Sequence, residues 1–539
     1  MYRRRHGHGH HHRADLTRTA SHGGDERSEV VDVYPGRHAR TRPDHPAMIM
    51  AGSGAMITHA ELDRRSNQMA RALREAGLAV DDTVAVVAEN RLEWAELIWA
   101  TQRSGLCIAP IQRHLGADVL ADVLTDSAVR AVITTSAHAG TVRAALDRLP
   151  KIPLRLCIGG APGFDDYAVT LDRYSGTPVP GERLGSRMMF SSGTTGRPKG
   201  IRHSRPDLHP GEAPPHLGGY TDLFGFTADT VYLSPAPTYH TAPFRFVLAI
   251  LQLGGTVVCQ ESFDAEGALA AIERYRVTHA QFVPTMLTRM LRLPAPVRVA
   301  ADLSSLRVAI TGAAPCPAEL KHRIMEWWGP VLHELYGASE SYGNCHIGPS
   351  DALERPGSVG RALVGRVHIL DPDDSDGPDL PVGDVGQIWF EGTQSFRYHG
   401  DEAKNRAARN KRGWSTVGDL GRLDGDGFLY LVGRRDHVII SGGVNVHPQQ
   451  AEDLLAGHPA VADVAVIGVP DDDLGQRVHA LVVPAPGTVA GPELGEALLA
   501  LARAGLPRPG CPRSIEFVRT LPRGENGKLY KRMLSQARC

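Results

Sequence analysis

Apolar positions in the first third of the chain switch repeatedly between helical and strand spacing. Leu62, Ser66, Met69 and Leu73 recur at intervals of three and four residues, which predicts a helix that begins near residue 60. Further on, the pattern predicts strands at 84–88, 106–109 and 131–134 and helices at 93–104 and 119–126. Strands that alternate with helices indicate parallel α/β layers with right-handed crossovers.

The same alternation returns in the middle of the chain. It predicts strands at 256–259, 280–283 and 307–310 and a helix at 265–276. The two stretches together predict two related α/β subdomains. Beyond a loop rich in Asp, Pro and Gly at 371–378, the runs 386–391 and 427–432 predict antiparallel strands of a small β-rich subdomain.

The last hundred residues have a pattern of their own. It predicts helices at 449–456 and 493–504 and strands at 461–469 and 478–483. The natural boundary is the segment 433–436. We therefore expect a large N-terminal domain at 31–435, a small α+β domain at 436–539, and a polar, disordered tail at 1–30.

The composition is that of an intracellular protein with more than one domain. A chain of 539 residues is too long for one ordinary domain. Its 59 basic and 60 acidic residues give a net charge of −1, which argues against nucleic acid as a partner. The seven cysteines form no CxxC pair, which predicts reduced thiols.

Neither a signal peptide nor a membrane span is predicted. The start of the chain has no apolar stretch, and the longest apolar run, 246–259, is interrupted by Gln and Gly and is too short for a bilayer. We therefore expect a cytoplasmic protein with no stable membrane insertion.

A loop rich in glycine and hydroxyl groups follows the apolar run 187–190. Residues 191–200 read Ser-Ser-Gly-Thr-Thr-Gly-Arg-Pro-Lys-Gly. Glycines bring backbone N–H groups close to a ligand, and with the hydroxyls and Lys199 they can form a phosphate cradle. The loop is not the common P-loop, in which Gly-Lys is followed by Ser or Thr. On composition alone, a surface turn is the alternative.

Three other segments are ambiguous when each is taken alone. The small residues at 311–315 could admit a planar ring or form an ordinary turn before a helix at 318–327. Asp419 could accept hydrogen bonds from ribose hydroxyls or from its own backbone. The basic segment 523–532 could be catalytic or simply a solvated surface.

In their order along the chain, the motifs resemble those of the adenylate-forming superfamily, which comprises acyl-CoA synthetases, firefly-type luciferases and peptide-synthetase adenylation domains. Five motifs match in order over residues 190–530. The resemblance implies that the glycine-rich loop holds ATP through Ser191, Ser192, Gly193, Thr194, Thr195, Gly196 and Lys199. It implies an adenine site at Gly312, Ala313, Ala314 and Tyr336, an α-phosphate contact at Ser339, a Mg²⁺ ligand at Glu340, and ribose contacts at Asp419 and Arg434.

The resemblance also implies that the small domain moves. Asp436 occupies the hinge position, and Gly442 and Gly443 match the loop that lines the pantetheine channel after rotation. Lys528 matches the lysine that bridges carboxylate and α-phosphate during adenylation. The match departs mildly from the family at Tyr530, where Arg is frequent, and at 524–525, where a Pro-Arg-Asn-type lead-in is common.

The implied reaction joins a carboxylic acid to coenzyme A at the expense of ATP, with Lys528, Glu340, Lys199 and His240 as catalytic residues. Tyr239 and His240 stand where amino-acid-activating domains resemble Phe-Asp, which favours a fatty- or aryl-acid CoA ligase. With Phe244 they would line a pocket for an apolar aliphatic or aryl acid, although His240 could equally be a packed core residue. No carrier domain follows, so free CoA is the expected acceptor.

Two other functions remain open at this point. The chain could retain only one half-reaction, such as thioester formation from a supplied acyl-adenylate. It could also be a non-catalytic nucleotide- or acyl-CoA-binding protein, although such a protein would not need Lys528, Glu340 and Lys199. A homodimer is compatible with each of these functions.

Overall fold

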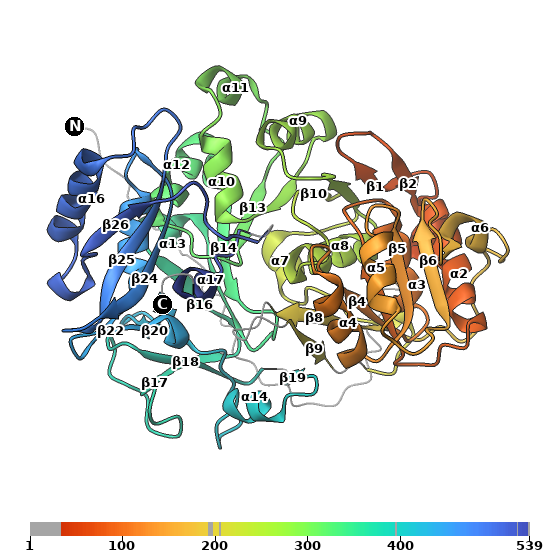
Figure 1. Ribbon diagram of the computed structural model, residues 1–539. Helices are drawn as coiled ribbons and strands as arrows, with labels where there is room; N and C mark the ends of the chain where they lie inside the picture. Colours follow the sequence, from red (N-terminus) through yellow and green to blue (C-terminus); the bar gives the residue numbers. More distant parts are fainter. Residues whose placement is uncertain (1–33, 192–197, 204–205, 394–395, 525–526, 537–539) are drawn as a thin grey trace, which may run out of the picture.

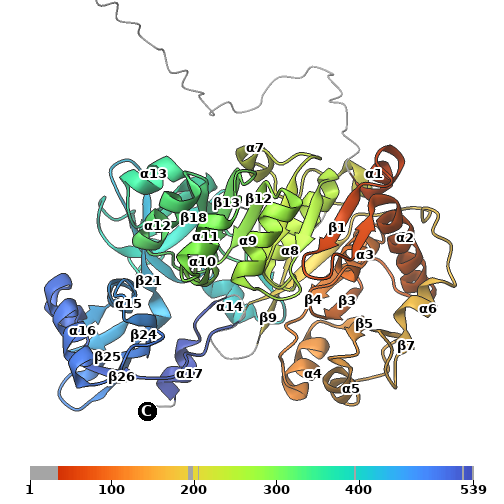
Figure 2. The same cartoon turned by 90° about the horizontal axis from the view of Figure 1, so that it is seen from above.

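Three β-sheets with flanking helices form the framework of the computed structural model (Figure 1). The structure describes residues 34–191, 198–203, 206–393, 396–524 and 527–536. A large sheet occupies the middle of the molecule. An eight-stranded sheet lies at one end, and the small C-terminal domain lies at the other, in both views (Figures 1 and 2). The α/β character predicted from the sequence is confirmed.

The eight-stranded sheet belongs mainly to the first half of the chain. Its order is β19-β9-β8-β4-β3-β5-β6-β7, parallel except at β8-β9 and β9-β19. The strands are β3 (Thr83–Val87), β4 (Cys107–Pro110), β5 (Val129–Thr135), β6 (Leu154–Ile158), β7 (Asp165–Asp166), β8 (Ser186–Ser191), β9 (Lys199–His203) and β19 (Phe396–Tyr398).

Helices cover both faces of this sheet, as the continuous apolar strands require. Val84 and Val86 of β3 pack with α2 (His59–Glu75) and α3 (Glu93–Gln102), whereas Ala85 and Val87 pack with α4 (Ala117–Asp126) and α5 (Ala139–Leu146). The helix predicted to begin near residue 60 is α2. It begins where Thr58 caps the backbone N–H of Glu61 and the Glu61 carboxylate accepts from the N–H of Thr58.

The large sheet has 13 strands in the order β17-β18-β20-β21-β16-β15-β14-β13-β12-β10-β11-β1-β2. Those of its α/β part are β1 (Pro46–Met50), β2 (Met56–Thr58), β10 (Val231–Ser234), β11 (Thr256–Cys259), β12 (His279–Phe282), β13 (Val308–Gly312) and β14 (Leu332–Gly337). The strands that continue it are β15 (Asn344–Ile347), β16 (Ser358–Val364), β17 (Arg366–Leu370), β18 (Gly386–Glu391), β20 (Asp419–Leu423) and β21 (Leu429–Arg434). The predicted β-rich segment therefore extends the large sheet, because β16 pairs with both β15 and β21.

Four longer helices pack on the large sheet: α8 (Thr241–Leu253), α9 (Ala265–Tyr275), α10 (Pro284–Leu291) and α12 (Ala318–Trp328). Shorter helices connect the elements: α1 (Pro35–Thr41), α6 (Tyr167–Leu171), α7 (Tyr220–Phe224), α11 (Ala295–Ala300), α13 (Pro349–Glu354) and α14 (Glu402–Ala407). Single 3-10 turns lie at Pro210–Glu212, Arg435–His437 and Arg508–Gly510. Among the described residues, no helix has both the length and the apolar character needed to cross a membrane.

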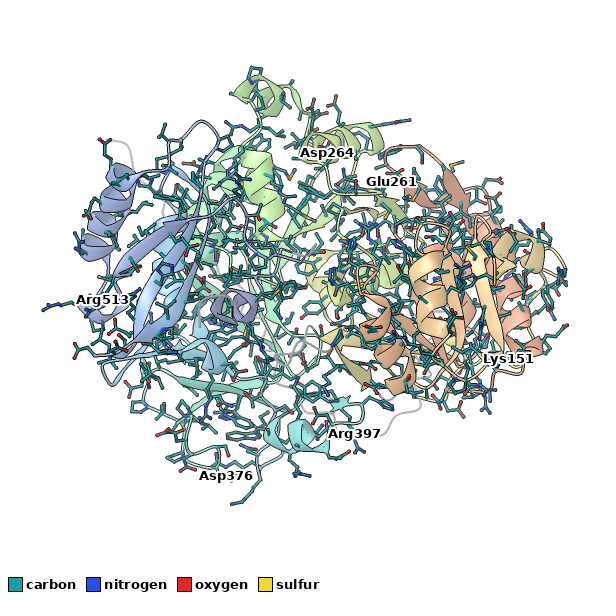
Figure 3. All side chains as sticks on the ribbon, viewed as in Figure 1. Lys151, Glu261, Asp264, Asp376, Arg397 and Arg513 are labelled. Carbon is teal, nitrogen blue, oxygen red and sulfur yellow. The ribbon has the colours of Figure 1, made fainter. Side chains whose placement is uncertain are left out.

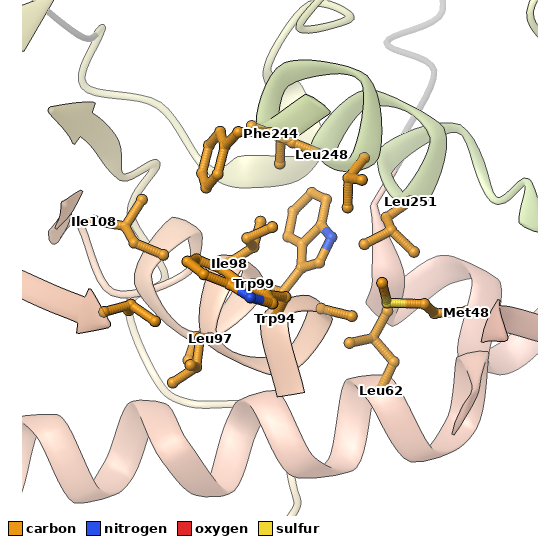
Figure 4. Packing of buried hydrophobic residues seen from close by; sticks show 14 of the residues in the cluster. Met48, Leu62, Trp94, Leu97, Ile98, Trp99, Ile108, Phe244, Leu248 and Leu251 are labelled. Carbon is orange, nitrogen blue, oxygen red and sulfur yellow. The ribbon is translucent and has the colours of Figure 1, made fainter. Parts of the chain in front are cut away.

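One core joins the two α/β subdomains. Trp94 and Trp99 of α3 are completely buried against α8, where Phe244 and Leu248 face them (Figure 4). Since large aromatic side chains bury much apolar area, this contact fixes α8 between the two sheets. The amino end of α8 is thereby held at the edge of the site described below.

The small domain contains β22 (Ile439–Ser441), β23 (Val444–Val446), β24 (Val461–Asp471), β25 (Gly475–Pro484) and β26 (Ser514–Phe517). Its helices are α15 (Pro448–Ala456), α16 (Pro492–Gly505) and α17 (Lys531–Gln536). It has its own apolar core between the sheet and α15 and α16. Charged side chains of both signs lie around the periphery of the whole molecule, for example Lys151, Glu261 and Arg513 (Figure 3).

Candidate active site

A cavity of about 1340 Å³ lies between the large sheet, α8 and the small domain. It is lined by residues from both domains, so neither domain forms it alone. Ten of the residues singled out in the sequence line it: Tyr239, His240, Gly312, Ala313, Ala314, Tyr336, Ser339, Asp419, Arg434 and Lys528.

The loop after β13 presents backbone to the cavity. A side chain on Gly312 would place its Cβ 2.5 Å from the carbonyl oxygen of Leu335 on β14, so only glycine fits there. Ala313 follows with φ of 66°, in the left-handed region. The strand thus ends in a flat turn of small residues, a surface against which a planar ring can lie.

A hydrogen-bonded group faces this turn. Asp419 of β20 lies opposite Arg434 of β21 in the antiparallel register and accepts a bond of 2.7 Å from its Nε. The other carboxylate oxygen of Asp419 accepts the hydroxyl of Tyr336 at 2.8 Å. Burial alone would lower the pKa of Arg434, but the charge of Asp419 and their hydrogen bond raise it above its usual value.

Glu340 lies beside this group, and 6% of its surface is exposed. Its Oε1 accepts the hydroxyl of Tyr398 at 2.8 Å, and the Lys404 ammonium lies 3.9 Å from the centre of the Tyr398 ring. Tyr398 and Lys404 could not be predicted from the sequence, because β19 and α14 are short and carry no recognisable motif. A tyrosine two residues before a glycine-ended turn is too common a pattern to identify them.

Lys528 reaches the cavity from the small domain. Burial, followed by the charge of Arg434, lowers its pKa, while Glu340 and Asp419 oppose that shift. Its hairpin is held by Arg523, whose guanidinium makes two bonds of 2.7 Å to Asp463. Gly527, with φ of 75°, packs so closely on Thr285 of α10 that an added Cβ would lie 2.5 Å from its hydroxyl.

The cavity edge near α8 is formed by the pair predicted for the acid pocket. The rings of Tyr239 and His240 lie 4.4 Å apart, and both line the cavity. The next residue, Thr241, shares a hydrogen bond of 2.7 Å with the hydroxyl of Ser339. Phe244 instead points into the core against α3 and is fully buried, so it does not line the cavity as predicted. Phe246 of the same helix does line the cavity.

The remaining predicted residues lie elsewhere. Lys199 of β9 forms an ion pair of 3.4 Å with Asp401. Ser191 ends β8, and Ser192, Gly193, Thr194, Thr195 and Gly196 lie outside the described residues. Asp436 lies in the turn after β21, and Gly442 and Gly443 form the exposed turn between β22 and β23. None of these last three is among the residues that line the cavity.

Comparison with known proteins identifies the fold. Residues 36–398 match the AMP-binding enzyme family, and residues 450–528 match the AMP-binding enzyme C-terminal domain. The chain belongs to the AMP-binding enzyme family. The resemblance to adenylate-forming enzymes predicted from the motifs is thereby confirmed.

Two of the similar proteins are CoA ligases that act on aryl acids or acids with an aromatic ring. The chain is 34% identical over 509 residues to feruloyl-CoA synthase from Amycolatopsis sp, covering 94% of this chain and 98% of that protein. It is 30% identical over 513 residues to indoleacetate–CoA ligase from Aromatoleum aromaticum, covering 94% and 97%. The chain is thus an enzyme of the acyl- and aryl-CoA ligase group.

A solved structure agrees in fold over nearly the whole length. The o-succinylbenzoate CoA synthetase MenE from Bacillus subtilis, in complex with the acyl-adenylate intermediate OSB-AMP, has a TM-score of 0.77 and 25% sequence identity. The match covers 93% of this chain and 98% of that chain.

Proposed function

We propose that the enzyme forms an acyl-adenylate from a carboxylic acid and ATP and then transfers the acyl group to CoA. The observation that carries this proposal is that Lys528 of the small domain faces the same cavity as Asp419, Arg434 and the Gly312 turn. A binding protein for nucleotides has no need of a cation delivered to the site by a second domain. The two domains 31–435 and 436–539 are the units of this proposal.

In the first step, a carboxylate oxygen attacks the α-phosphorus of ATP, and the bond to the bridging oxygen breaks to release pyrophosphate. Lys528 offsets negative charge at the α-phosphate and the carboxylate, so its contribution is electrostatic. The Gly312 turn and Tyr336 bind adenine, Asp419 and Arg434 hold the ribose, and Ser339 contacts the α-phosphate. Residues 191–196 and Lys199 hold the phosphates that leave.

The donor set fits a metal ion held mainly by the substrate. The described residues contain no cluster of three or more His, Cys, Asp or Glu side chains that could form a metal site on their own. Glu340 supplies one buried carboxylate, and Mg²⁺ is commonly bound by one or two carboxylates together with phosphate oxygens and water. When bound, Mg²⁺ would neutralise charge on the phosphates.

In the second step, the CoA thiolate attacks the carbonyl carbon of the adenylate, and AMP leaves. We propose that the small domain first rotates about Asp436, which withdraws Lys528 and brings Gly442 and Gly443 to the site. Their exposed position in the present arrangement supports this, because it leaves them available for a second set of contacts. His240 and Tyr239 would lie beside the acid, and Phe246 and Leu217 would form an apolar wall of its pocket.

The test combines the protein with ATP, Mg²⁺, CoA and a panel of aliphatic and aryl acids, and in parallel with synthetic acyl-adenylates and CoA. Pyrophosphate, AMP and acyl-CoA are measured. We expect all three products with at least one acid. If acyl-CoA forms only from the supplied adenylates, the enzyme performs only the second half-reaction. If it forms from neither substrate, the proposal is refuted.

Docking of the small domain offers a further prediction. Arg292, at the end of α10, donates bonds of 2.9 and 3.3 Å to the carbonyl oxygens of Ala462 and Val461. Arg292→Ala is expected to slow adenylate formation about fivefold, the effect of losing about 1 kcal/mol of docking. Thioester formation from a supplied adenylate should not slow, since it uses the rotated domain. Equal slowing of both steps would contradict this assignment, and Arg289→Ala on the same helix is the control.

A further inference from the structure

An arginine of the cavity wall, Arg245, lies within electrostatic reach of a second arginine, Arg187. Arg245 lies on α8 and lines the cavity, as do Thr241 and Ala242 one turn earlier on the same helix face. Arg187 lies on β8 and is not among the residues that line the cavity, but the charge of Arg245 lowers its pKa. Arg187 belongs to the eight-stranded sheet, whereas Arg245 belongs to a helix that packs on the large sheet. The core that joins α3 and α8 holds these two elements next to each other.

The charges of these arginines are not balanced within the described part of the chain. The Nε atoms of both are buried and have no hydrogen-bond partner among the described residues. Burial, with Arg245 adding to it, lowers the pKa of Arg187 to about 9, and burial lowers the pKa of Arg245; the groups that oppose these shifts are Cys107 and Tyr220, not a carboxylate. The surroundings of Arg187 and Arg245 therefore contain two guanidinium ions and no anion from the described residues.

The neighbouring side chains are polar and also lack partners. The Tyr220 hydroxyl and the His216 Nε2 are buried with no hydrogen bond to a described residue, and Tyr220 lines the cavity. Burial and the charges of Arg187 and Arg245 lower the pKa of His216 to about 3, which keeps it neutral. The group thus offers several hydrogen-bond donors and only positive charge.

Both side chains are partly buried. A cation with reduced access to water and no counterion is costly in a folded protein, and an anion that binds it offsets this cost. A carboxylate matches the planar fork of a guanidinium and forms short, charge-assisted bonds with it. We propose that the acid activated by this enzyme carries a second carboxylate, which Arg245 binds with the charge of Arg187 and the hydroxyl of Tyr220 close by. The proposal rests on the proposed function and specifies its substrate as a dicarboxylic acid.

The second carboxylate is distinct from the reacting one. The reacting carboxylate belongs near Lys528 and Ser339, and Ser339 is bonded to Thr241 at the start of α8. Arg245 lies four residues after Thr241, about 6 Å further along the helix axis. The acid would therefore extend from Ser339 along α8 to Arg245, in a cavity that apolar Phe246 and Leu217 also line.

Matched acids test the proposal directly. The protein is assayed for pyrophosphate release with hexanoic against adipic acid, and with cinnamic against 4-carboxycinnamic acid. We expect kcat/KM to be at least about tenfold higher for the diacid in at least one pair, the range of a charge-assisted hydrogen bond. Arg245→Met should remove this preference without changing KM for CoA, whereas Arg245→Lys should keep part of it. Arg143→Met, an exposed arginine of α5, should behave as the unaltered protein.

Stability supplies the second readout. Because Arg245 has no anionic partner among the described residues, Arg245→Met should leave the melting temperature of the ligand-free protein unchanged or raise it. A marked fall would overturn the proposal by revealing a structural partner. Equal or better turnover of every monoacid would also overturn it. If no acid is turned over, the proposed function fails, and binding then tests the dicarboxylic acid separately. Diacids should raise the melting temperature of the unaltered protein but not that of Arg245→Met, and monoacids should raise neither.

Discussion

Lys528→Ala is expected to slow acyl-adenylate formation about 10²- to 10³-fold, the usual effect of removing one group that stabilises transition-state charge. The lysine reaches the cavity on a hairpin fixed by Arg523 and Asp463, so the substitution removes the ammonium without disturbing its support. Single-turnover release of pyrophosphate measures the effect. Thioester formation from a supplied acyl-adenylate should change little if, as we propose, the small domain rotates before that step.

The control is Arg532→Ala, which removes an exposed cation only four residues away. It should leave both half-reactions unchanged. If Lys528→Ala slowed both half-reactions equally, the lysine would act in overall folding or docking and not in adenylation.

Lys321→Met is expected to lower the free energy of unfolding by about 3–5 kcal/mol, the cost of leaving a buried charge without its partner. Lys321 of α12 donates a bond of 2.7 Å to Glu334 of β14 and another of 3.1 Å to the carbonyl oxygen of Ser358. Both side chains are almost completely buried, with 2% and 4% of their surfaces exposed. Denaturant unfolding followed by circular dichroism measures the loss.

The loss should depend on pH. Burial raises the pKa of Glu334 above its ordinary 4.5, and Lys321 opposes that rise, so the pKa climbs further in Lys321→Met. The folded variant then binds this proton more tightly than the unfolded chain does. Its deficit is smallest below about pH 4.5 and grows as the pH rises through the folded-state pKa.

Lys321→Met combined with Glu334→Leu is the matched control, since it replaces both charges with apolar groups. It should recover most of the lost stability at neutral pH. A double variant as unstable as Lys321→Met would show that packing, and not the unpaired carboxylate, causes the loss.

Most helices and strands of the α/β parts could be predicted from periodicity. The helix predicted at 93–104 is α3, Glu93–Gln102, and the strand predicted at 461–469 is β24, Val461–Asp471. Apolar spacing fixes which face of an element is buried, and that information is local. The short strands β1 and β19 were missed because a few residues without alternation give no such signal.

The site was predicted in the same way, one motif at a time. The sequence pointed to Asp419 and Arg434, and the structure adds that Asp419 accepts hydrogen bonds from both Arg434 and Tyr336. Phe244 shows the limit of such reasoning. It lies four residues after His240, which places it near the site in sequence, but the helix turns it towards Trp99 and the core.

The sequence by itself determined the family and the α/β class and located the motifs that we propose to bind the nucleotide, because each depends on residues close together in the chain. Only the tertiary structure decided which distant residues share the cavity. Arg187 and Arg245 carry no motif and are meaningful only because β8 and α8 are packed against one core. Their charges lack a counterion within the described residues. Residues so far apart in sequence come close only in the folded chain, and local spacing does not predict this.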